Sequence, residues 1–62
     1  MSAKQASILV VDDEPRLVRF VRTELESDGY RVLTAGEGQA ALRTLEREDV
    51  DLIVLDIMLP GM

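Results

Sequence analysis

The chain contains no cysteine and no histidine, and its single lysine is Lys4. Without cysteine there is no disulfide or thiolate metal site to stabilise the fold. With histidine absent as well, metal ligands must be oxygens. Basic residues number 7 against 12 acidic ones, a net charge of -5, which argues against nucleic-acid binding by this segment.

Long apolar runs are also missing. Residues 1–7 are polar and lack the apolar core of a signal peptide, and no later stretch approaches the length that spans a membrane. We therefore expect a cytoplasmic protein without membrane association. At 62 residues the chain is one small domain at most, and a domain of that size buries only about 60% of its unfolded surface.

Two short apolar runs end in acid. Residues 8–11 (Ile-Leu-Val-Val) are followed by Asp12 and Asp13, and residues 52–55 (Leu-Ile-Val-Leu) by Asp56. A run of this kind is typical of a buried parallel strand whose carboxyl end opens into a polar site. We expect the three acids to converge.

Helical patterns separate these runs. Pro15 suits the first turn of a helix that Asp13 or Glu14 would cap, and Gly29 suits its end. Residues 30–35 alternate like a half-exposed edge strand, and residues 40–47 form a weaker amphipathic helix. The predicted order is therefore strand, helix, strand, helix, strand.

This order predicts an α/β fold of the βαβαβ type. Each crossover spans about 15 residues, more than the dozen or so that a parallel connection requires. If the third strand lies on the far side of the first, right-handed crossovers put one helix on each face and give the strand order 2-1-3. A ligand crevice would then lie between strands 1 and 3, lined by Asp12, Asp13 and Asp56.

An oxygen-only acidic site favours Mg²⁺, because clustered carboxylates repel unless a cation lies among them. The backbone carbonyl of Met58 is a possible further ligand. A carboxylate beside Mg²⁺ can also attack phosphorus and form an aspartyl-phosphate. Asp56 is the better nucleophile candidate, because it stands alone at the end of what we expect to be the more buried strand. Asp12 and Asp13 suit metal ligation, directly or through water.

The residues around these acids resemble a known family. Residues 8–15 (Ile-Leu-Val-Val-Asp-Asp-Glu-Pro) and 51–62 (Asp-Leu-Ile-Val-Leu-Asp-Ile-Met-Leu-Pro-Gly-Met) look like the two signature stretches of a response-regulator receiver domain of two-component signalling. The resemblance implies a flavodoxin-like doubly wound sheet. It also implies that a histidine kinase phosphorylates Asp56, that Asp13, Asp56 and the Met58 carbonyl hold Mg²⁺, and that Asp12 binds the ion through water.

The same resemblance implies a signalling module rather than an enzyme. The loop after Asp56 is similar to that of receivers in winged-helix transcription factors. Receivers of this family continue through two further strands that carry a Ser or Thr and a Lys of the switch. We therefore expect residues 1–7 to be a disordered or extended tail, and residues 8–62 to be the first half of a receiver, unable to complete switching. We also expect its open third strand to pair with a second copy in a homodimer.

Three alternatives stay open. The first is an isolated or engineered half-fold that self-associates without phosphotransfer. Gly36, Gly38 and Ala41 follow a strand in the pattern of a dinucleotide-binding fingerprint, with Asp56 at the expected distance. That reading leaves Asp12 and Asp13 unexplained. A phosphatase of the aspartyl-phosphate class is disfavoured, since such enzymes have a second acid where Met58 stands.

Overall fold

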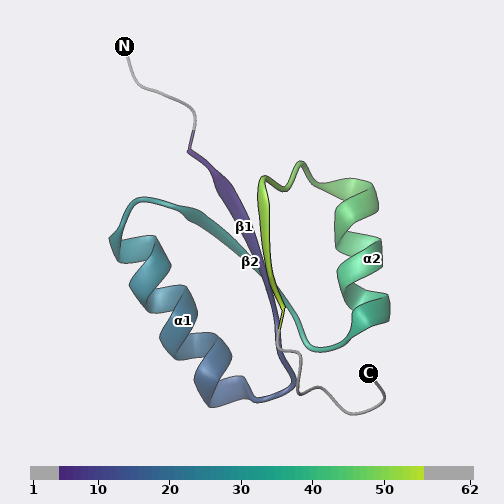
Figure 1. Ribbon diagram of the computed structural model, residues 1–62, viewed down its shortest axis with the longest axis horizontal. Helices are drawn as coiled ribbons and strands as arrows, with labels where there is room; N and C mark the ends of the chain where they lie inside the picture. The colour runs from purple at the N-terminus through teal and green to yellow at the C-terminus, as the bar shows by residue number, and fades with distance from the viewer. Residues whose placement is uncertain (1–4, 56–62) are drawn as a thin grey trace.

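A three-stranded parallel sheet with one helix on each face forms the domain (Figure 1). The computed structural model describes residues 5–55. In chain order the elements are β1 (Ser7–Val11), α1 (Pro15–Ser27), β2 (Arg31–Ala35), α2 (Gly38–Arg47) and β3 (Leu52–Leu55). The α/β class and the element order predicted from the sequence are confirmed, with β1 starting one residue earlier than expected and β2 one residue later.

The strand order is β2-β1-β3, as predicted. Both neighbours run parallel to β1. The registers pair Val11 with Ala35 on one side and with Leu55 on the other, so the three strands end level. The polar residues that follow these strands therefore start from the same edge of the sheet.

Burial concentrates on β1, all five residues of which are buried. Leu9 and Val11 form the core beneath α2 together with Ala35 and Ala41. β1 is the central strand and is covered by a helix on each face, so its apolar side chains have neighbours on every side.

The third strand is not buried, although its apolar run is typical of a buried strand, and its exposure agrees with the open third strand expected for this chain. All four residues of β3 are exposed, from 40% at Val54 to 56% at Leu52. Within residues 5–55, β3 is paired only with β1, so one of its edges and part of both its faces are open. The apolar side of α1 is only partly covered, since Val18, Val21 and Leu25 are half-buried and Phe20 is 62% exposed.

The ends of α1 follow the sequence signals. Glu14 is the N-cap, and its side chain accepts a hydrogen bond from the Arg16 N–H at 3.4 Å. Gly29 has a φ of 96°, the left-handed conformation expected just past a helix. Arg22 and Glu26, four residues apart on the exposed face, form an ion pair at 3.3 Å. Neither helix in the described part of the chain is long and apolar enough to cross a membrane.

Candidate functional site

The carboxyl edge of the sheet holds the first two predicted acids. Asp12 and Asp13 directly follow β1, where Val11 is level with Ala35 and Leu55. Asp12 is only 6% exposed, whereas Asp13 is exposed. The pair thus presents one carboxylate held inside the fold and one turned to solvent, and their separate roles stay a prediction.

Local hydrogen bonds fix Asp12. Its backbone N–H donates to the Ala35 carbonyl at 3.1 Å, which extends the β1–β2 pairing by one residue. Its Oδ1 accepts from the Glu14 N–H at 2.9 Å, closing a turn that leads into α1. A carboxylate accepts several hydrogen bonds or ligands. The Asp12 carboxylate is therefore oriented by the backbone and keeps capacity for a cation or for water.

The other predicted site residues, Asp56 and Met58, lie outside the described residues. Between residues 5 and 55, no three acidic side chains gather closely enough to hold a metal ion. The donor chemistry at the sheet edge nevertheless fits a hard cation, because Asp12 and Asp13 supply carboxylate oxygens at the end of β1. The assignment of Asp12, Asp13, Asp56 and the Met58 carbonyl as a Mg²⁺ site stays a prediction.

Two hollows border the acids on the α1 face of the sheet. One, of about 360 Å³, lies between α1 and β2, and its wall includes Asp12, Asp13, Arg19, Arg22 and Thr34. This larger hollow lies on the β2 side, away from the strand that leads to Asp56.

The second hollow is a groove of about 220 Å³ between α1 and β3. Its lining is apolar except for Asp12: Val10, Val11, Leu17, Val18, Val21, Val54 and Leu55. The groove reaches the acidic edge on the side where position 56 follows β3.

Packing does not require glycine at the two glycine positions of the possible dinucleotide fingerprint. A Cβ added at Gly36 or at Gly38 would meet no atom within 4 Å. In that motif glycine permits close packing of helix on strand, and no such packing is found here. Glu37 is also the N-cap of α2, where a bound pyrophosphate would have to lie.

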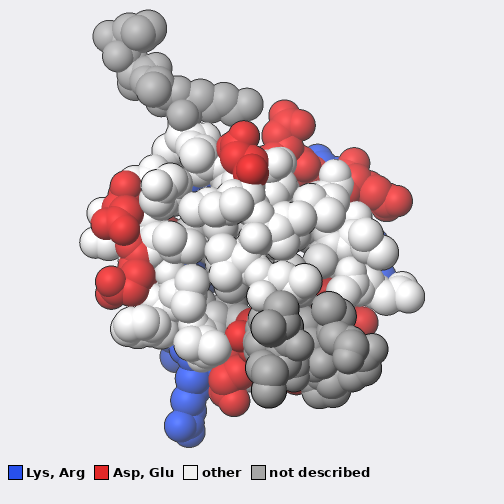
Figure 2. Space-filling model, in the orientation of Figure 1, with Lys and Arg blue, Asp and Glu red and all other residues white. Residues whose placement is uncertain are grey.

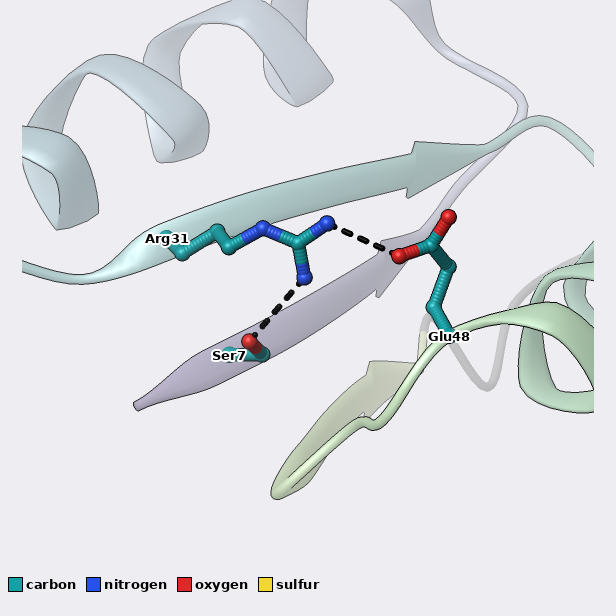
Figure 3. A network of polar contacts seen from close by, with 3 residues as sticks. All are labelled: Ser7, Arg31 and Glu48. Carbon is teal, nitrogen blue, oxygen red and sulfur yellow. Dashed lines mark hydrogen bonds and ion pairs between the residues drawn. The ribbon is translucent and has the colours of Figure 1, made fainter. Parts of the chain in front are cut away.

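A polar cluster at the opposite, amino edge of the sheet was not expected from the sequence. Arg31 of β2 donates to the Ser7 hydroxyl at 3.2 Å and to a Glu48 carboxylate oxygen at 2.8 Å (Figure 3). The Ser7 N–H donates to the Asp51 Oδ2 at 2.7 Å. The only sequence signal for this cluster is the acid at position 51, directly before the apolar run of β3.

Comparison with known proteins adds independent information. The family model of the response regulator receiver domain matches residues 8–62. The chain is 55% identical over 53 residues to the alkaline phosphatase synthesis transcriptional regulatory protein PhoP of Bacillus subtilis, covering 86% of this chain and 22% of that protein. It is 45% identical over 62 residues to the transcriptional regulatory protein GlrR of Escherichia coli, covering all of this chain and 14% of that protein.

Solved structures agree with the fold. The response regulator TrrA of Thermotoga maritima, in complex with Mg²⁺ and BeF, is 41% identical and superposes with a TM-score of 0.85 over 94% of this chain and 50% of its own. TrrA bound to the histidine kinase ThkA gives a TM-score of 0.84 with the same coverage. The chain thus spans about half of the solved receiver and under a quarter of the curated regulators above.

Proposed function

Because the chain belongs to the response regulator receiver family, we propose that it is the phosphoacceptor module of a two-component response regulator, with Asp56 as the acceptor. A histidine kinase is the proposed phosphodonor. The Asp56 carboxylate attacks phosphorus, an oxygen–phosphorus bond forms, and the nitrogen–phosphorus bond to the kinase histidine breaks. The module is a substrate and signal carrier, and its relatives PhoP and GlrR are transcriptional regulators.

The observation that carries this proposal is the register of β3 on β1. Val11 pairs with Leu55, and acids follow both residues in the sequence. Continuation of this register by one residue would bring position 56 level with Asp12. Oxygen ligands from both strands would then surround one point at the carboxyl edge, where the dipoles and loops of a parallel α/β sheet bind ligands.

Asp13, Asp56 and the Met58 carbonyl are the proposed direct ligands of Mg²⁺, and Asp12 is the proposed ligand of a metal-bound water. When bound, Mg²⁺ neutralises charge on the phosphoryl oxygens and aligns them for in-line transfer. The hydrogen bond from the Glu14 N–H orients the Asp12 carboxylate for binding the metal-bound water. The solved TrrA structures support both partners of this proposal, since one contains Mg²⁺ and BeF and the other a histidine kinase.

Mg²⁺ with beryllofluoride, a phosphoryl mimic, tests the proposed site. We expect the two together to raise the melting temperature of the 62-residue chain more than Mg²⁺ alone does, because a ligand that binds only the folded state stabilises it. Asp56→Asn should lose this increment, so that beryllofluoride added to Mg²⁺ leaves its melting temperature unchanged. An equal increment in both proteins, or none in the natural chain, would contradict the proposal.

For the 62-residue chain we further propose self-association through β3. Figure 2 shows an uncharged surface over β3 between the two helices, with acidic side chains around it. Residues 52–55 are all apolar and all exposed, and an open apolar strand edge is a template for pairing with another strand. A twofold axis perpendicular to the sheet would give the order β2-β1-β3-β3-β1-β2, with an antiparallel junction and the two acidic sites at opposite ends.

The dimer is proposed for the 62-residue chain as it stands. It is compatible with phosphorylation, because β3 pairs through its edge while the acids stand at its carboxyl end. If the chain self-associates and Asp56 accepts no phosphoryl group, the half-fold without phosphotransfer is the correct description. The expected cytoplasmic location and the absence of nucleic-acid binding by this segment remain part of the proposal.

A further inference from the structure

Asp51 and Ser7 are joined by two short hydrogen bonds at the amino edge of the sheet. The Ser7 N–H donates to the Asp51 Oδ2 at 2.7 Å, and the Asp51 N–H donates to the Ser7 carbonyl at 2.8 Å. The pair comes directly before the first register partners of β1 and β3, Ile8 and Leu52. Asp51 therefore forms hydrogen bonds with both the backbone N–H and the backbone carbonyl of Ser7.

The apolar side chains of β3 do not define its register by themselves. A strand slips easily when each shifted position meets an equivalent residue. Residues 52–55 are four aliphatic side chains in a row, all between 40% and 56% exposed, opposite a run of four aliphatic side chains in β1. If β3 shifted by one residue along β1, most aliphatic side chains of β1 would still face an aliphatic side chain of β3. Asp51 differs, because its carboxylate oxygen meets the Ser7 N–H only in the observed register.

Ser7 is itself held from the other side. It is 4% exposed, and its hydroxyl accepts a hydrogen bond from Arg31 of β2. Arg31 is paired in turn with Glu48, in the connection between α2 and β3 (Figure 3). The Arg31 N–H also donates to the Ala6 carbonyl at 2.9 Å. The anchor to which Asp51 binds is therefore fixed by β2 and by the segment that leads into β3.

We propose that Asp51 is a positioning residue that sets the register of β3 on β1 and thereby the position of Asp56 beside Asp12 and Asp13. A slip of one residue moves a strand by about 3.3 Å. Mg²⁺ holds its oxygens at about 2.0–2.1 Å in near-ideal octahedral geometry, so ligands on a slipped β3 would miss the ion. The effect on Asp56 rests on the proposed function, whereas the register itself does not.

Hydrogen exchange and cross-strand contacts measured by NMR on the 62-residue chain test the register directly. We expect Asp51→Ala to raise the exchange rate of the Ser7 amide about tenfold, because a hydrogen bond to a charged acceptor is lost. Contacts between Leu9 and Ile53 should weaken, while contacts between Leu9 and Leu33 on the other side of β1 stay. Asp49→Ala is the matched control, since it removes the same charge from an exposed residue two positions earlier.

Asp51→Asn tests whether the hydrogen bond, rather than the negative charge, holds the register. It also serves as a control for general disruption of the fold by Asp51→Ala. Its amide oxygen can still accept from the Ser7 N–H, so we expect Ser7 protection and the Leu9–Ile53 contacts to return to near the natural values. If Asp51→Ala loses its helical circular dichroism, Asp51→Glu takes its place, since it keeps the charge and displaces the oxygens by one methylene. Unchanged Ser7 protection in Asp51→Ala, or equal loss in Asp51→Asn, would overturn the proposal.

Mg²⁺ affinity connects the register to the site. In the folded protein we expect Asp51→Ala to weaken Mg²⁺ binding about tenfold or more and Asp51→Asn to restore it, with Asp49→Ala unchanged. Natural Mg²⁺ affinity in an Asp51→Ala protein with a disturbed β3 register would contradict the positioning role. If the natural chain binds no Mg²⁺, the proposed function fails, and the exchange and contact measurements still decide whether Asp51 sets the register.

Discussion

Leu9 of β1 and Ile53 of β3 are register partners with opposite environments. Leu9 is 0% exposed and Ile53 is 44% exposed, although they lie side by side in the ladder. The contrast shows how unevenly the apolar residues of this small fold contribute to its core. β1 has a strand on each side, whereas β3, in the described part of the chain, has one neighbour.

Substitution of these two residues should therefore have unequal effects. Leu9→Ala removes a fully buried side chain, a change that costs about 2–5 kcal/mol in other cores. A domain this small has little stability in reserve, so we expect Leu9→Ala to be largely unfolded by circular dichroism at 25 °C. Ile53→Ala should remain folded and lose about 1 kcal/mol or less, as is usual away from a core. A Leu9→Ala protein that is as folded as Ile53→Ala by circular dichroism at 25 °C would contradict the observed difference in burial.

Gly29 gives a second contrast. Its φ of 96° lies in the left-handed region, where a side chain costs about 1–2 kcal/mol. We expect Gly29→Ala to destabilise the fold by that amount in urea titrations. Gly36→Ala is the control, because Gly36 has no such φ and an added Cβ would meet nothing within 4 Å. If Gly29→Ala is as stable as Gly36→Ala, the turn after α1 is not held in the left-handed conformation.

The open edge of β3 makes the oligomeric state testable. We expect the natural chain to sediment as a dimer and Ile53→Lys to shift it toward monomer, because a lysine on an edge strand opposes strand pairing. Leu42→Lys on α2 introduces the same charge at a residue that is 63% exposed and outside the proposed junction. It should leave the association constant within about threefold, as surface changes distant from an interface contribute little. A monomeric natural chain, or equal weakening by both variants, would refute association through β3.

The order of the strands and helices along this chain could be predicted from the sequence. Aliphatic runs ended by Asp12 and Asp56 predicted two parallel strands, and Pro15 and Gly29 marked the ends of α1, because these signals are local. The strand order followed from crossover length and handedness together with the family resemblance. The prediction that Asp12 lies at the carboxyl edge is confirmed, and the roles of Asp56 and Met58 remain predictions because both lie outside the described residues.

Burial and long-range pairing were harder to predict. The apolar run of β3 indicated a buried strand, but burial depends on what lies beside a strand, and the residue types alone do not specify this. The hydrogen bonds between Ser7 and Asp51 join residues 44 positions apart. They become visible only once the register of β1 and β3 is known.

The acceptor role of Asp56 is tested most directly by intact mass spectrometry after incubation with a small phosphodonor such as acetyl phosphate and Mg²⁺. We predict that the natural chain gains the mass of one phosphoryl group, that chelation of Mg²⁺ prevents the gain, and that Asp56→Asn abolishes it. Asp49→Asn, which neutralises an exposed acid at the other edge of the sheet, should still gain it. No gain in the natural chain, or an undiminished gain in Asp56→Asn, would contradict the assignment of Asp56 as the phosphoacceptor.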